Sequence, residues 1–142
     1  MNLYRSLQEA QQKRCSSFLN KYAFFAFDKD QYKTGLQKLG LTENDTGQLV
    51  RIPGGGYLIK DSAPAFNQMM QDFNKERLEA MHDTNTGRQF TIDMFRTELN
   101  DHEYSYTGDP SEALEALGYT LEEIFDDPYL LETFKEAARE AG

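Results

Sequence analysis

Three helix starts in the last third of the chain constrain its fold more than any other sequence feature. Asp109-Pro110 and Asp127-Pro128 each place a capping carboxylate before a proline, whose fixed φ suits the first turn of a helix. Glu112 follows Asp109 at the offset of a capping box, and Thr120 with Glu123 repeats that box. The sequence therefore predicts three short helices after Asp109.

A run of three glycines predicts a β-hairpin in the first half of the chain. Gln48–Ile52 and Tyr57–Lys60 are short, β-prone segments on either side of Pro53–Gly56, where glycine tolerates positive φ. The aromatic run Tyr22–Phe27 has the length of a strand and predicts a third, buried strand that joins this hairpin. We therefore expect an α+β fold, with a small antiparallel sheet of about three strands packed with helices and a helical C-terminal end.

Apolar residues at helical spacing predict four further helices, over Asn2–Asn20, Lys29–Leu39, Ala63–His82 and Phe90–Leu99. The side chains expected to point inward from the last two are Phe66, Met69, Met70, Phe73, Leu78, Met94, Phe95 and Leu99. The length of 142 residues suits one domain, with an α+β part over 1–96 and an acidic helical end over 97–142.

Charge is divided unevenly between these two parts. Residues 97–142 hold thirteen acidic and two basic side chains, whereas residues 1–96 hold eleven acidic and thirteen basic ones. Such an acidic segment repels nucleic acid and anionic membranes and attracts basic protein surfaces. The pattern predicts a basic protein partner, with no direct contact to nucleic acid or membrane.

Part of this acidity has a local explanation. Five of the thirteen acids lie at predicted helix starts, where they favour the helix dipole: Asp109, Glu112, Glu122, Glu123 and Asp127. The remaining acids either solubilise the protein or form a partner-binding face. If they form such a face, the contributing residues are expected to be Glu98, Asp101, Glu103, Asp126, Glu132 and Glu136.

Catalytic signatures are weak. The single cysteine, Cys15, excludes an intramolecular disulfide and a cysteine-based zinc site, and no protease signature surrounds it. The lysine and hydroxyl residue that follow the glycines of a phosphate-binding loop are missing after Gly56. We expect no enzyme activity, no catalytic residue and no cofactor. No apolar run reaches membrane-spanning length, so we expect a cytoplasmic protein.

Two alternatives remain open. His102 and Glu103, together with His82 and Asp83, have side chains that bind divalent metals, which suits a metal-dependent hydrolase or nuclease. Their separation of about twenty residues gives no recognised metal motif, so the primary prediction contains no metal site. The other alternative is an interaction scaffold that uses the aromatic hairpin Leu49–Ile59, with Tyr57 as its main contact.

Several segments, in this order, resemble a family of small uncharacterised proteins encoded on phages and mobile elements of Firmicutes. The segments are Phe24–Tyr32, Gly35–Gly40, Gly54–Tyr57, Asp101–Tyr104, Thr107–Pro110 and Ala113–Gly118, and the resemblance spans about Ala23 to Arg139. The most specific part is His102-Glu103-Tyr104 with Ala113–Gly118 downstream. The family pattern usually has Asn before that tripeptide, whereas this chain has Asp101.

The resemblance implies a biological setting, that of phages and mobile elements, but it does not imply a reaction or a cofactor. Small acidic proteins of mobile elements often bind and block host defence machinery, as anti-CRISPR proteins do. The leading hypothesis is therefore a non-enzymatic inhibitor that binds a basic, nucleic-acid-handling host protein, such as an RNA-guided nuclease or another defence effector. In this hypothesis, carboxylates compete with phosphate for the lysines and arginines of the target.

Overall fold

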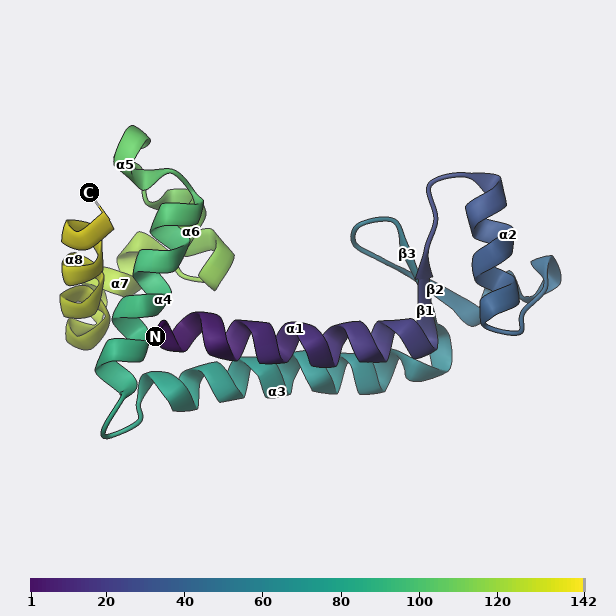
Figure 1. Ribbon diagram of the computed structural model, residues 1–142, viewed down its shortest axis with the longest axis horizontal. Coiled ribbons are helices and arrows are strands. Elements are labelled where there is room, and N and C mark those ends of the chain that lie inside the picture. Colours follow the sequence, from purple (N-terminus) through teal and green to yellow (C-terminus); the bar gives the residue numbers. More distant parts are fainter. Residues whose placement is uncertain (142) are drawn as a thin grey trace. The chain divides into compact units, whose positions relative to one another are not determined.

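A computed structural model describes residues 1–141 and has the expected α+β class, with one three-stranded antiparallel sheet among helices (Figure 1). The chain divides into two compact units. The helical unit comprises Met1–Glu9 and Glu76–Gly142, and the sheet unit comprises Ala10–Lys75. Helices α1 (Leu3–Tyr22) and α3 (Ala63–Met81) contribute residues to both units. No helix within residues 1–141 has the length and apolar character needed to cross a membrane.

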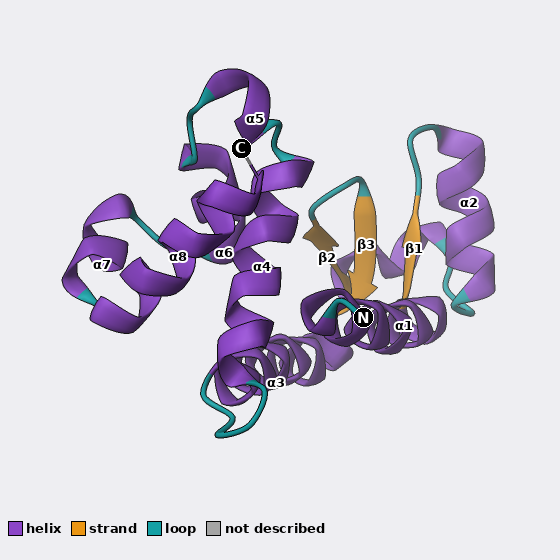
Figure 2. Cartoon of the chain, turned by 60° about the vertical axis from the view of Figure 1, so that its left-hand side comes forward, coloured by secondary structure: helices purple, strands orange, loops and turns teal. Residues whose placement is uncertain are grey.

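The sheet of the sheet unit has β3 (Gly56–Ile59) at its centre, between β1 (Ala23–Phe25) and β2 (Leu49–Ile52) (Figure 2). Both pairings are antiparallel, and they place Phe24 opposite Tyr57 and Tyr57 opposite Arg51. The predicted hairpin and its pairing with the first strand are confirmed. The short 3-10 helices η1 (Glu43–Gln48) and η2 (Lys60–Ser62) lead into β2 and follow β3.

Glycine is required at the tip of the hairpin. Gly54 and Gly55 have φ values of 83° and 82°, in the left-handed region that other residues adopt at a cost. The turn therefore requires positive φ at Gly54 and Gly55, as expected from the run of glycines.

Helix α2 (Lys29–Lys38) packs on the sheet through a close approach of its backbone. It begins at Asp28, whose carboxylate accepts a hydrogen bond from the N–H of Gln31, as an N-cap does. A Cβ atom on Gly35 would lie 2.0 Å from Cδ2 of the Phe24 ring. Because Gly35 has no side chain, α2 approaches the sheet closely enough for Leu36 to pack with Phe24 in the small core of this unit.

The prediction of a buried strand over Tyr22–Phe27 is wrong in its length and in its burial. The strand ends at Phe25, which is 47% exposed, and Phe27 is 78% exposed. Because side chains alternate along a strand, Ala23 and Phe25 lie on the face opposite to Phe24. Phe27 lies beyond the paired residues, so the sheet does not cover it.

The helical unit is organised around α4 (Gly87–Asp101), ten of whose fifteen residues are buried. A helix buried on most sides forms the centre of a core, not one edge of it. Its contacts are with α6 (Ser111–Leu117) and above all with α8 (Pro128–Ala141); α5 (Tyr104–Thr107) and α7 (Leu121–Asp126) complete the unit. Met94, Phe95 and Leu99 lie in this core, as predicted.

The helix starts of the C-terminal segment follow the sequence signals closely. Thr120 and Glu123 form the predicted capping box at α7, and Asp127 accepts hydrogen bonds from two N–H groups at the start of α8. At α6 the expected capping box is absent, because Pro110 occupies the N-cap position. Asp109 instead accepts a bond from the N–H of Ser111.

The inward face predicted for α3 is partly wrong. Met70 and Leu78 are exposed, whereas Phe66 and Phe73 contact α1: the ring of Phe66 lies 5.9 Å from that of Phe18, and the carbonyl of Phe73 accepts a bond from Gln11. Within the described residues, no helix or strand therefore covers Met70 or Leu78.

The close approach at Gly35 predicts that Gly35→Ala destabilises the sheet unit. The added methyl overlaps the Phe24 ring, and such overpacking costs about 1–3 kcal/mol, more than the gain in helix propensity. Urea or thermal unfolding followed by circular dichroism measures the loss. Gly47→Ala is the matched control, because a Cβ at Gly47 has no neighbour within 4 Å. Equal melting temperatures for the two variants would contradict the proposed packing.

Candidate functional site

Two of the predicted partner-binding acids hold the start of α1 against the end of α4. The hydroxyl of Tyr4 donates to Oε1 of Glu98 at 2.7 Å. Arg5 donates from one terminal nitrogen to both carboxylate oxygens of Asp101, at 2.9 Å each. Glu98 and Asp101 therefore have partners more than ninety residues earlier in the chain.

Glu98 lies inside the helical unit, where it is 7% exposed. Burial and the hydrogen bond to Glu98 raise the pKa of Tyr4 above its ordinary value, which keeps that hydroxyl a donor. His102 adds a contact, since its Nδ1 lies 2.8 Å from the carbonyl oxygen of Glu98. Glu98 is therefore not part of an exposed acidic surface.

Two more of the predicted acids, Glu132 and Glu136 on α8, bind the same arginine of α4. Arg88 donates to Glu132 at 2.9 Å and also to Glu136, and these bonds raise the pKa of its guanidinium. One turn further along α8, Glu140 accepts from Arg96 at 2.7 Å. Such pairs reduce the field that these carboxylates present to a partner.

Within residues 97–141, five other exposed carboxylates have no hydrogen bond or ion pair. They are Glu103, Glu112, Glu115, Glu122 and Asp126, which we call the free acidic set. Glu103 and Asp126 were predicted as partner-binding residues, and Glu112, Glu115 and Glu122 were not.

From the sequence alone, Glu112 and Glu122 are explained by their places at helix starts, whereas Glu115 is one of the remaining acids and is not among the predicted binding residues. In the structure, Glu123 is the residue that caps α7, and the carboxylate of Glu122 has no partner in residues 1–141. Glu112 and Glu115 are three residues apart on α6, and Glu122 and Asp126 are four apart on α7. Each pair therefore shares one side of its helix.

The exposed side of α7 also carries two large apolar side chains. Leu121 is 41% exposed and Phe125 is 62% exposed. They are four residues apart and each is followed by an acid, Glu122 or Asp126. An apolar pair bordered by carboxylates has the make-up of a protein-binding surface, where buried aromatic residues are surrounded by polar ones.

The possible metal ligands are not brought together. His82 precedes α4 and His102 follows it, and a helix of fifteen residues is about 22 Å long. The His82 ring packs on Tyr129, and Asp83 accepts bonds from the backbone of Asn85 and Thr86. Within residues 1–141, no group of three or more His, Cys, Asp or Glu residues is placed to hold a metal ion.

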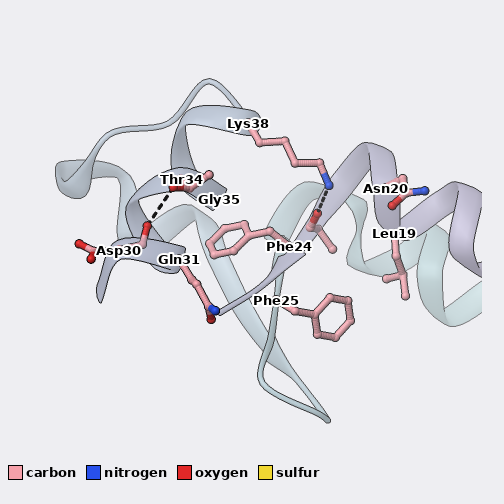
Figure 3. A pocket seen from close by; sticks show the side chains of 10 residues that line it. Leu19, Asn20, Phe24, Phe25, Asp30, Gln31, Thr34, Gly35 and Lys38 are labelled. Atoms are coloured by element: carbon pink, nitrogen blue, oxygen red, sulfur yellow. Dashed lines mark hydrogen bonds between the residues drawn. The ribbon is translucent and has the colours of Figure 1, made fainter. Parts of the chain in front are cut away.

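The sheet unit has several hollows on its surface, and two of them border β1 or the residues that follow it. The first, of about 520 Å³, is bordered by the end of α1, by β1 and by α2 (Figure 3). Its polar groups bond one another: Lys38 Nζ donates to the carbonyl of Ala23 at 3.1 Å, and Thr34 donates to that of Asp30 at 3.0 Å. The second hollow, of about 540 Å³, lies beside Arg51 and Tyr57.

The fold and its surfaces define a class: an α+β protein with an acidic helical unit and a three-stranded sheet unit. Within that class, the chain belongs to a family of unknown function, DUF7659, whose model matches residues 3–140. No curated protein matches the chain, and no solved structure matches it.

The hydrogen bonds of Asp83 predict a pH-dependent contribution to stability. The backbone N–H groups of Thr86 and Asn85 lower the pKa of Asp83 below its ordinary value of about 3.9. Its contribution is therefore complete above that value and is lost as the pH falls through the lower, folded pKa. Asp83→Asn should lower the melting temperature at neutral pH, and the difference from the wild type should close in strong acid.

Thermal unfolding of both proteins across an acidic pH series measures this difference. Asp61→Asn is the control, since Asp61 has no side-chain partner within residues 1–141 and should change little at any pH. A gap between Asp83→Asn and the wild type that stays constant into acid would mean that the ionised carboxylate is not the stabilising group.

Proposed function

We propose that this chain is a non-enzymatic, protein-binding protein whose acidic helical unit binds a basic protein surface. The observation that carries the proposal is the free acidic set on α6, α7 and the turn after α4, whose carboxylates have no partner within residues 1–141. The helical unit holds eighteen acidic and six basic residues, a net charge of −12. The sheet unit holds six acidic and nine basic residues, a net charge of +3.

The exposed apolar residues of α7 add the apolar contact area that charged groups do not provide. Interface energy is usually concentrated in a few large side chains, with charged groups around them that steer the encounter. Leu121 and Phe125 fit the first role, and Glu122 and Asp126 fit the second. The expected binding surface is therefore the outer side of α7, extended by Glu112 and Glu115 of α6.

The chemistry of the surface and the sequence resemblance support the proposed partner. Carboxylates on a rigid helical surface compete with phosphate for lysine and arginine, so the target is a basic protein that handles nucleic acid. The resemblance to proteins of phages and mobile elements favours a host defence effector, such as an RNA-guided nuclease, as the target. Binding would then inhibit that effector in the manner of an anti-CRISPR protein.

This surface predicts that reversing two free carboxylates weakens capture of the partner. The tagged chain is incubated with host lysate, and bound proteins are eluted with a salt gradient and identified by mass spectrometry. Glu122→Lys combined with Asp126→Lys should release the partner at lower salt than the wild type does, because opposing charges are lost and exposed charge pairs are screened by ions. Phe125→Ala should weaken capture with a smaller change in salt dependence.

Asp61→Lys combined with Asp72→Lys is the matched control, since it makes the same charge change on exposed residues of the sheet unit. Unchanged capture by the control and loss by the α7 variant would support the assignment. Equal elution profiles for both variants and the wild type would exclude the acidic helical unit as the binding surface.

A further inference from the structure

The second hollow of the sheet unit combines aromatic rings with cations that have no anionic partner. It lies where the chain passes from β1 into α2 and is bordered by Tyr32 of α2, Arg51 of β2 and Tyr57 of β3. The residues that carry the argument are Phe27, Lys29, Tyr32, Arg51, Gly55 and Tyr57. All of them belong to the sheet unit, whose net charge is +3.

A row of side chains crosses one face of the sheet and ends at an exposed guanidinium. The Phe24 and Tyr57 rings are stacked with centroids 5.2 Å apart, and Cζ of Arg51 lies 5.6 Å from the centroid of Tyr57 on the neighbouring strand. The ring of Tyr32 meets both aromatic rings edge-on. Arg51 thus stands at the outer end of the row, on the edge strand β2.

The donors around the hollow have few partners. Within residues 1–141, neither Arg51 nor Lys29 forms an ion pair, and the hydroxyls of Tyr32 and Tyr57 form no hydrogen bond. One acid, Asp28, also lines the hollow, and its carboxylate accepts the N-cap bond of α2. The hollow therefore presents mainly hydrogen-bond donors and positive charge, which suits an anion.

Phe27 gives the hollow a flat aromatic wall with one open side. A Cβ atom on Gly55 would lie 2.7 Å from Cε1 of the Phe27 ring, so the ring packs directly against the glycine backbone. The ring is nevertheless 78% exposed, which leaves its other face to solvent. An exposed ring supported from behind is the arrangement on which planar bases stack.

We propose that this hollow binds a nucleotide unit, with its base stacked on Phe27 and its phosphate held by Arg51 and Lys29. An aromatic ring carrying an anionic group matches both halves of the hollow, whereas an acidic peptide side chain matches only the cations. The inference revises the expectation that the chain avoids nucleic acid. That expectation followed from the acidic residues of 97–142, none of which belongs to the sheet unit.

Fluorescence anisotropy of a short labelled oligothymidylate, titrated with the full-length chain at low salt, tests the site. Phe27→Ala and Arg51→Gln should each weaken binding by about tenfold, the usual effect of losing one stacking or phosphate contact. Both residues are exposed, and circular dichroism confirms that each variant is folded. Lys60→Gln is the control, because it removes one positive charge of the same unit outside the hollow, as Arg51→Gln does inside it.

Competition identifies the source of the ligand. Displacement of the probe by an unlabelled mononucleotide would assign the site to free nucleotides, and displacement by oligonucleotide alone would assign it to single-stranded nucleic acid. The proposal is overturned if the probe does not bind, or if Phe27→Ala and Arg51→Gln bind it as the wild type does. It is equally overturned if polyglutamate competes as well as the oligonucleotide, since charge without a base would then suffice.

Discussion

The helical unit depends on one buried carboxylate, Asp93, at the centre of α4. It is 1% exposed, and a buried charge is tolerated only when it is paired and hydrogen-bonded. Asp93 accepts bonds from the N–H of Leu3 at the start of α1, from Gln89 and from Arg96. Because Arg96 also binds Glu140 of α8, this network ties together the start of α1, α4 and α8.

Contacts of this kind also explain why the sequence has more acidic residues than the surface has carboxylates without a partner. Glu98 and Asp101 of α4 pair with side chains at the start of α1, and Glu132 and Glu136 of α8 pair with an arginine of α4. These four acids therefore act within the helical unit. The acids left over lie on the short helices α6 and α7 and in the turn before α5. Glu103 in that turn has a φ of 57°, a left-handed conformation that a non-glycine residue adopts at some cost. Fewer carboxylates are therefore without a partner in residues 1–141 than the net charge of −12 suggests.

Features that depend on neighbours in the sequence could be predicted, and features that depend on distant residues could not. The capping box of Thr120 and Glu123 and the glycine turn of the hairpin are local, and both are confirmed. The bonds of Glu98 and Asp101 to Tyr4 and Arg5 span more than ninety residues and leave no local signal. The same limit applies to Phe27, whose ring packs against Gly55 of the hairpin turn. The aromatic run Tyr22–Phe27, which is typical of a core, therefore holds three exposed rings, Tyr22, Phe25 and Phe27.

Hydrogen–deuterium exchange of the full-length chain, alone and with its captured basic partner, tests the central claim most directly. The claim is that the outer side of α6 and α7 forms the partner-binding surface. It predicts slower exchange on binding over residues 111–126 and unchanged exchange over the hairpin, residues 49–59. Slower exchange confined to the hairpin, with residues 111–126 unaffected, would contradict it and would leave the free carboxylates as groups that only keep the protein in solution.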